Sequence, residues 1–148
     1  MKLFNTNPKP NSGIIAVLLF AILTAVSVLP SNAQSQMTDL AVSRAKNFVV
    51  AMTNGDVSNM KRLSTPGFYR ENFPYSDEEV RSRLLRVPAE KRQKLRNQIQ
   101  NSTESVEMDY GNNTMTIRLR STETNKTMTF FMVDERNNND WKISDYYY

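Results

Sequence analysis

Three close pairs of carboxylates are the residues of this sequence that could carry acid–base chemistry. They are Glu78 with Glu79, Glu107 with Asp109, and Asp134 with Glu135. Glycosidic cleavage needs two carboxyl groups that flank a cleft. Each pair instead falls on a predicted helix start or on the polar side of a predicted strand, where solvated carboxylates are expected. We therefore expect no catalytic residue, no metal site and no cofactor.

Other common catalytic groups are missing from the chain. Its 148 residues include no histidine and no cysteine. A Ser-His-Asp or Cys-His nucleophile, a disulfide framework and a cysteine-type zinc site are therefore excluded.

A basic stretch runs from Arg81 to Arg96 and contains one acidic residue, Glu90. Such a stretch favours weak contact with an anionic membrane surface or an acidic partner. The alternative is a solvated helix face, because the stretch lacks Trp and Phe and is divided by Pro88. Its basic residues are Arg81, Arg83, Arg86, Lys91, Arg92, Lys94 and Arg96.

Aromatic residues supply a candidate ligand pocket. Tyr and Phe side chains can line an amphipathic pocket that binds an apolar ligand. Ordinary core packing is the alternative for Phe68, Phe73 and Trp141. The candidate pocket residues are Phe68, Tyr69, Phe73 and Tyr75, with Phe131 and Val133 from a strand that is apolar on both sides.

The first 33 residues predict a signal peptide. Lys2 and Lys9 precede an uncharged apolar run over 14–29, and small residues then lead to Ala33. We expect cleavage after Ala33 and an exported protein, periplasmic or secreted. The alternative is an N-terminal membrane anchor, but sixteen helical residues span only about 24 Å, short of a bilayer core of about 30 Å.

Removing this segment leaves a single domain over 34–148 with 17 basic and 15 acidic side chains. A net charge of +2 gives little support for nucleic-acid binding, so we expect no nucleic-acid partner.

Hydrophobic spacing predicts helices in the first half of the domain. One runs over 37–54, with Thr38 or Asp39 at its start and Gly55 at its end. A shorter helix follows Asp56 and ends at Thr65-Pro66-Gly67, and 68–75 reads as an edge strand or a loop. Ser76 opens a further helix, and another covers 89–100.

After Asn101 apolar and polar residues alternate with a period of two residues. This alternation occurs in four segments and predicts four strands. Their apolar positions alternate in 106–110, 115–120, 128–133 and 141–144, with turns at Asn-rich segments. Short turns imply an antiparallel meander. The fold class is therefore α+β, with N-terminal helices packed on a curved antiparallel sheet of about four strands. Of the final tyrosines Tyr146, Tyr147 and Tyr148, at least one should be exposed.

The run FVVAMTNGDVSNMKRL (48–63) and the closing Asp140-Trp141-Lys142-Ile143 resemble segments of the cystatin-like, nuclear-transport-factor-2-like superfamily. The chain looks like that superfamily's exported bacterial members of unknown function, related to lumazine-binding-like proteins. The resemblance implies a cone-shaped fold with a pocket between helices and sheet. Some relatives hold an isomerase site there, but no position of this chain matches their catalytic motifs.

We therefore expect an exported, non-enzymatic bacterial domain that binds a small apolar ligand or a protein partner. Two alternatives stay open. One is an isomerase- or hydratase-like enzyme in the same fold, which needs a buried carboxylate of raised pKa beside a Tyr. The other is a homodimer that uses the apolar outer side of the third strand.

Overall fold

The structure is a computed structural model that describes residues 31–148, so the predicted apolar export segment 14–29 lies outside the described residues. Residues Ser35–Tyr148 form one compact unit. Five helices precede four strands in this part of the chain, which confirms the α+β class. They are α2 (Ser31–Asn54), α3 (Val57–Leu63), α4 (Pro66–Asn72), α5 (Asp77–Leu85), α6 (Ala89–Gln100), β1 (Thr103–Asp109), β2 (Thr114–Arg120), β3 (Thr127–Val133) and β4 (Lys142–Tyr147).

The helix α2 begins earlier than the spacing predicts. We expected a start at Met37 with Thr38 or Asp39 as cap, but the helix already includes Ser31. Ser31–Gln36 contains neither Gly nor Pro to stop a helix, and the Thr38 hydroxyl donates to the Ser35 carbonyl one turn back, at 2.8 Å. The predicted cleavage site after Ala33 lies within this helix.

The end of α2 follows the prediction. Gly55 has a φ of +68°, the left-handed conformation that terminates a helix. Asp56 then caps α3, since its Oδ1 accepts from the Asn59 amide at 3.1 Å.

The prediction of an edge strand or a loop over 68–75 is wrong for most of that segment. The helix α4 occupies Pro66–Asn72 instead. Thr65 caps this helix through its hydroxyl, which accepts from the Phe68 amide at 3.2 Å. Pro66 takes the first helical position, where a missing N–H costs nothing. The helix α3 ends at Leu63, just before Thr65-Pro66-Gly67, as predicted, and the same segment also starts α4.

The later helices agree with the prediction. Ser76 caps α5, because its hydroxyl accepts from the Glu79 amide at 3.3 Å. The helix α6 has the expected bounds of Ala89–Gln100, and Ile99 is its buried apolar residue.

The sheet is the predicted antiparallel meander, in the order β1-β2-β3-β4. At its turns, Asn113, Asn125, Asn137 and Asn139 adopt positive φ, which Asn tolerates better than most residues. Trp141 is buried, but it precedes β4 rather than belonging to the last strand as expected. The free side of β4 meets the α3–α4 junction, where the Thr65 amide donates to the Ile143 carbonyl at 2.8 Å.

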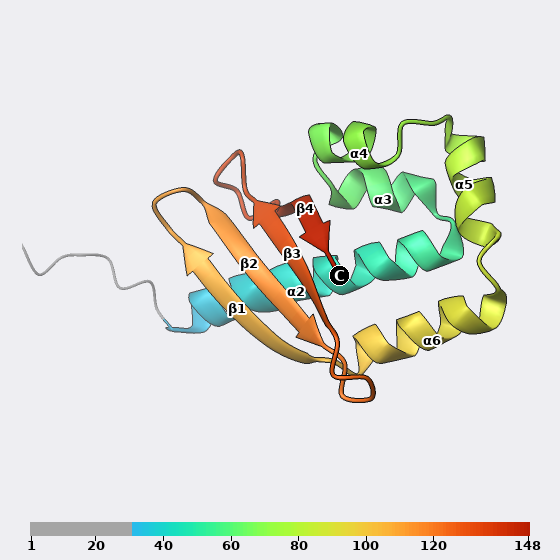
Figure 1. Ribbon diagram of the computed structural model, residues 1–148. Coiled ribbons are helices and arrows are strands. Elements are labelled where there is room, and N and C mark those ends of the chain that lie inside the picture. Colours follow the sequence, from blue (N-terminus) through green and yellow to red (C-terminus); the bar gives the residue numbers. More distant parts are fainter. Residues whose placement is uncertain (1–30) are drawn as a thin grey trace, which may run out of the picture. The chain divides into compact units, whose positions relative to one another are not determined.

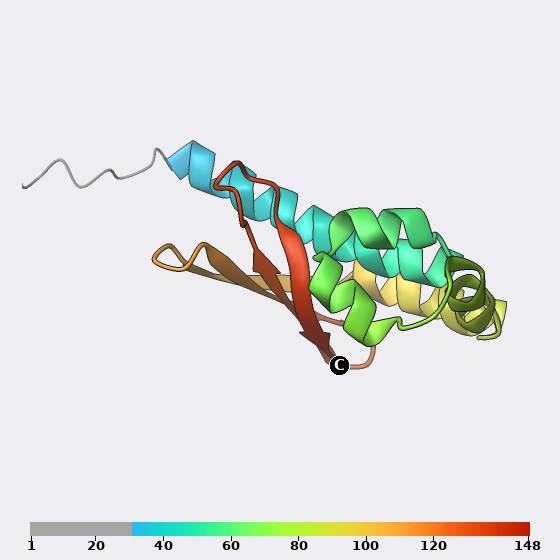
Figure 2. The ribbon, with the colours of Figure 1, turned by 90° about the horizontal axis from the view of Figure 1, so that it is seen from above.

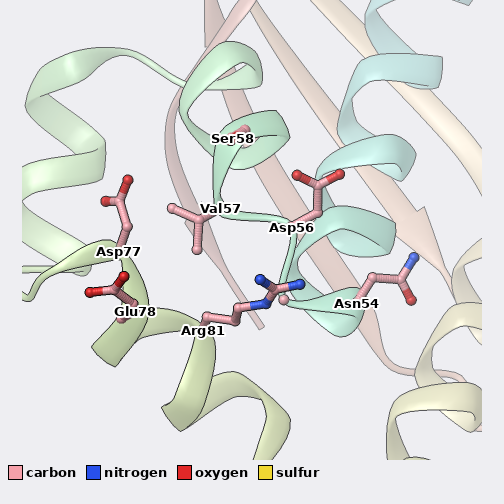
Figure 3. A pocket seen from close by; sticks show the side chains of 8 residues that line it. Asn54, Asp56, Val57, Ser58, Asp77, Glu78 and Arg81 are labelled. Carbon is pink, nitrogen blue, oxygen red and sulfur yellow. The ribbon is translucent and has the colours of Figure 1, made fainter.

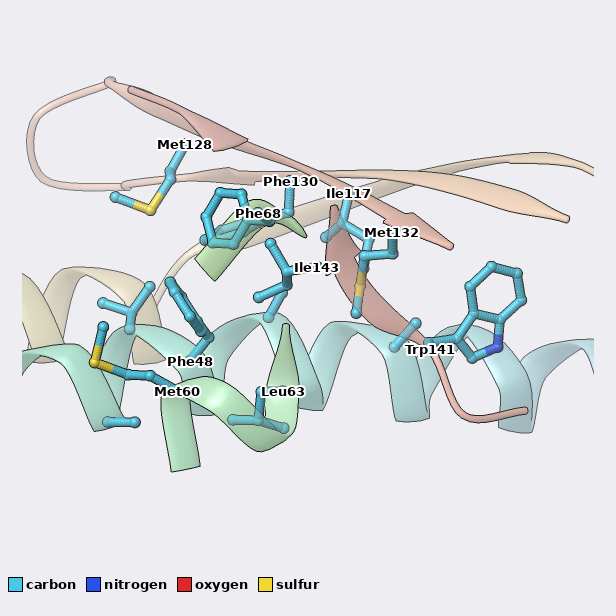
Figure 4. Packing of buried hydrophobic residues seen from close by; sticks show 14 of the residues in the cluster. Phe48, Met60, Leu63, Phe68, Ile117, Met128, Phe130, Met132, Trp141 and Ile143 are labelled. Atoms are coloured by element: carbon cyan, nitrogen blue, oxygen red, sulfur yellow. The ribbon is translucent and has the colours of Figure 1, made fainter. Parts of the chain in front are cut away.

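Helix α2 packs against both the sheet and the other helices of this unit (Figures 1 and 2). From residue 35 onward it first runs behind the sheet, and α3 and α6 then flank its later part (Figures 1 and 2). The core lies between one side of the sheet and the helices, chiefly α2, α3 and α4 (Figure 4). The other side of the sheet is not covered by a helix (Figure 2).

Candidate functional site

The predicted aromatic pocket residues separate into three places. Phe68 and Tyr69 are buried on α4, and Phe73 packs against both, with ring centroids 6.4 and 5.3 Å away. Tyr75 is exposed, and the Arg83 guanidinium lies 3.7 Å from its ring centroid. The structure brings only the first three together.

Phe131 and Val133 lie on the side of the sheet away from the core. Their neighbours Phe130 and Met132 are fully buried, whereas Phe131 and Val133 are half-buried. The Phe131 ring lies 5.6 Å from that of Tyr147, which is exposed. These two residues therefore do not share a pocket with the aromatic residues of α4.

Side chains occupy the space where the resemblance places a pocket. The Phe48 ring meets Phe68 edge-on at 5.9 Å, and Tyr146 lies 5.8 Å from Phe68 and 6.0 Å from Phe130. All three Phe residues are at most 4% exposed. Figure 4 shows Phe48, Phe68 and Phe130 within this layer.

A β-bulge directs Tyr146 into this layer. Met132 pairs with Ile143, but Phe131 pairs with Asp145, so Ser144 is the extra residue. Strict alternation from Ile143 would have placed Tyr146 on the outer side. Tyr147 and Tyr148 are exposed, which confirms that the three tyrosines do not all point inward.

Tyr69 has a buried hydroxyl without a hydrogen-bond partner among the described residues. Burial raises the pKa of its phenol above the ordinary 10.0, and the Asp77 carboxylate adds to that rise. The Lys61 ammonium lies 5.3 Å from the ring centroid and acts in the opposite direction. Burial likewise raises the pKa of the Tyr146 phenol.

The basic stretch is only partly a free surface. Arg92 donates to the Thr53 carbonyl at 2.8 Å, and Arg96 donates to Asn54 Oδ1 at 2.8 Å. Both cations meet the C-terminal end of α2, where the helix dipole favours positive charge. Arg92 and Arg96 therefore fasten α6 to α2.

The other members of the stretch differ in their surroundings. Arg83 pairs with Glu79 one turn away, at 3.0 Å. Arg81 lines a polar cleft of about 480 Å³ between the start of α3 and the start of α5 (Figure 3). Arg86, Lys91 and Lys94 are exposed.

The carboxylates serve local structure. Glu107 pairs with Arg118 at 2.8 Å, and Asp109 accepts from the Gly111 amide and the Asn112 side chain. Those contacts lower the pKa of the Glu107 carboxyl through Arg118, and that of the Asp109 carboxyl through Asn112. Glu78 lines the polar cleft of Figure 3.

Asp134 is the one buried carboxylate among the described residues, at 5% exposed. Its oxygens accept from the amides of Asn138 at 3.3 Å and Asn139 at 2.7 Å, so it organises the β3–β4 turn. Its neighbour Glu135 is exposed. Within residues 31–148, no three acidic side chains are grouped so that they could hold a metal ion.

A second cleft, which we call the lysine cleft, lies between α6, the β2–β3 turn and the end of β4. Its volume is about 300 Å³ and its wall is mostly apolar. Met128 is buried at its floor, Leu95 is half-buried, and the Lys126 ammonium lies 5.2 Å from the Tyr148 ring centroid. It is lined by Lys91, Lys94, Leu95, Gln98, Thr124, Lys126, Met128 and Tyr148.

Sequence reasoning singled out Lys91 and Lys94, as part of the basic stretch, and Tyr148, as one of the final tyrosines, but did not bring them together. Thr124, Lys126 and Met128 come from a different part of the chain, and Tyr148 from a third. No spacing within one segment signals that such residues meet.

Comparison with protein-family models, with curated proteins and with solved structures found no match to this chain. Within residues 31–148, no helix combines the length and the apolar character needed to cross a membrane.

Proposed function

We propose that the chain is an exported, non-enzymatic binding domain that holds a small, partly apolar ligand in the lysine cleft. The proposal rests on one observation: accessible apolar surface is found in the lysine cleft and not in the interior. Phe48, Phe68 and Phe130 fill the interior, whereas the lysine cleft is open and mostly apolar. Its volume of about 300 Å³ is at the lower end of the range for small-molecule sites.

The carboxylates favour binding over acid–base catalysis. A general base near neutral pH needs a carboxyl whose pKa is raised toward neutrality. Asp56, Glu107, Asp109 and Asp140 instead have lowered pKa values, because hydrogen bonds stabilise their charged forms. The buried Asp134 accepts from backbone amides of its own turn.

The export proposal is supported by the N-terminal sequence alone. Lys2 and Lys9, the apolar run over 14–29 and the small residues up to Ala33 have the order of a signal peptide. Comparing the N-terminus of the protein recovered outside the cytoplasm with that of the full chain tests this part. A start at Gln34 is expected, and an intact apolar segment would favour the anchored alternative.

Native mass spectrometry of protein purified from its own host tests the binding proposal. We expect a mass excess under gentle conditions that disappears on denaturation. Substituting Lys126→Glu, which reverses a charge at the cleft, should reduce the occupied fraction. A mass equal to that of the chain in both conditions would contradict the proposal.

A homodimer is the second candidate, and one specific observation favours it. Phe131, Val133 and Tyr147 lie on the side of the sheet that no helix covers. If this side joins two copies, Phe131→Lys should give a monomer in sedimentation experiments. A wild-type monomer, or a variant that still dimerises, would remove this candidate.

A further inference from the structure

We propose that the ligand of the lysine cleft is an amphipathic organic anion, with one acidic head group and a short apolar tail. This inference rests on the proposed function of the cleft. It names the class of molecule that the charges and the apolar floor together would select.

The charges of the cleft are the first step. The described part of the chain contains six lysines. Lys46, Lys61 and Lys142 each contact a carboxylate, at 2.5, 2.5 and 3.2 Å. The other three, Lys91, Lys94 and Lys126, form no ion pair with any described residue. All three line the lysine cleft.

No Asp or Glu side chain lines the cleft to balance these charges. Glu90 and Glu123, which are adjacent in sequence to cleft residues, line a neighbouring shallow cleft that shares Lys94. For Glu123, the side chain reaches a residue of the lysine cleft, since its Oε2 is 3.5 Å from the Gln98 amide nitrogen. Three ammonium groups around one concavity repel one another, and an anion bound among them would relieve that repulsion.

The apolar floor is the second step. Met128 and Leu95 provide aliphatic surface, and Tyr148 provides an aromatic ring. Methionine is flexible and polarisable, so it adapts to irregular apolar ligands. The lysine side chains add apolar stems beneath their charged ends. A small inorganic anion would leave this surface unused, whereas a tail would cover it.

The concave shape favours a single dissolved molecule over a bilayer. Membrane-binding surfaces present protruding apolar side chains beside basic residues. The exposed large apolar residues of the basic stretch are Leu85 and Val87, close to the α5–α6 turn, and neither lines the cleft. We therefore assign the cleft to a free amphipathic anion.

Isothermal titration of the folded, mature-length protein with decanoate and with 1-decanol tests this assignment. We expect decanoate to bind about tenfold or more tightly than the alcohol, since ammonium groups strengthen hydrogen bonds to a carboxylate. Added salt should weaken decanoate binding and leave decanol unchanged. Equal affinities for the two probes would overturn the proposal.

Matched variants locate the site. Lys94→Met and Lys126→Met keep the apolar stem and remove one charge, so each should lower decanoate affinity about 3- to 10-fold. Arg70→Met is the control, because Arg70 is exposed on α4 and lies outside the cleft. An equal loss in the control would overturn the site, provided that circular dichroism shows all three variants folded.

The outcomes separate this inference from the proposed function. If host-purified protein carries a ligand, yet decanoate and decanol bind equally, the binding role stands and the anion class fails. If anionic vesicles bind and free decanoate does not, the source is a bilayer and the assignment is wrong. If no probe binds and the purified protein carries nothing, both proposals fail.

Discussion

At the residue scale, two buried polar atoms of the core lack a hydrogen-bond partner among the described residues. They are the Tyr69 hydroxyl and Trp141 Nε1. An unpaired buried polar group lowers stability by about 1–3 kcal/mol relative to a paired one. Neither atom lines the lysine cleft.

Tyr69→Phe should therefore leave stability unchanged or raise it, by up to about 1 kcal/mol, because it removes an unsatisfied group and keeps the ring contacts. Urea unfolding followed by circular dichroism measures this effect. A loss of more than about 1 kcal/mol would show that the hydroxyl has a partner in solution.

Asp140 is a residue through which pH should act on stability. Its pKa is lowered by the hydrogen bond from Arg44, at 2.5 Å, and further by Lys142, at 3.2 Å. A carboxyl whose folded pKa lies below its unfolded value stabilises the fold above the unfolded value, and this contribution is lost as pH falls through the folded pKa.

We expect the free energy of unfolding to fall as pH drops below the ordinary value of 3.8. Asp140→Asn should reduce the slope of the free energy of unfolding against pH in that range. Asp39→Asn, at an exposed position on α2, is the comparison variant. If both variants show the same slope of unfolding free energy against pH as the wild type, the Arg44–Asp140 contact does not contribute to the pH dependence of stability.

At the element scale, the α2–α3 turn has the strictest backbone requirement. Gly55 has a φ of +68°, and a Cβ there would lie 3.1 Å from Leu85 Cγ and 3.2 Å from Arg81 Cγ. A side chain would thus meet both an unfavourable conformation and the packed surface of α5.

Gly55→Ala should destabilise the protein by about 1–2 kcal/mol. Gly67→Ala is the matched control, because no atom lies within 4 Å of a Cβ there and its φ is not positive. In the helix α4, Ala is favoured over Gly, so the control should be neutral or stabilising by up to about 1 kcal/mol. Equal thermal shifts in the two variants would contradict this account.

Much of the fold could be predicted because its signals are local. The Gly55 stop, the Asp56 and Ser76 caps and the alternation in the strands act over a few residues. The helix at Pro66–Asn72 is not predicted because a Thr-Pro-Gly sequence suits a turn as well as the first residues of a helix. In the structure, Phe68 of this helix packs against Phe48 and Tyr146, which are distant in sequence, and the local sequence does not report such contacts.

The candidate site was less predictable than the fold. Alternation placed Phe131 and Val133 on the outer side of β3, but no local pattern predicted the bulge at Ser144 that turns Tyr146 inward. The lysine cleft joins α6 to residues 124–128 and 148. Which lysines have carboxylate partners depends on contacts between distant segments, which spacing does not report.

At the scale of the whole molecule, two kinds of surface remain after the core is built. One is the uncovered side of the sheet around Phe131 and Tyr147. The other is the lysine cleft, which gathers the lysines that the described fold does not pair. A mostly apolar wall and lysines without an ion pair among the described residues coincide in the cleft, and for this reason we propose ligand binding there.

A ¹H–¹⁵N NMR titration of the mature-length protein with decanoate tests this claim most directly. The account predicts shifts confined to residues 91–98, to 124–128 and to Tyr148, with amides near Phe48 and Phe68 unchanged. Shifts centred on those buried aromatic residues would mean that the ligand enters the interior. That result, or the absence of any shift, would contradict a binding site on the surface at the lysine cleft.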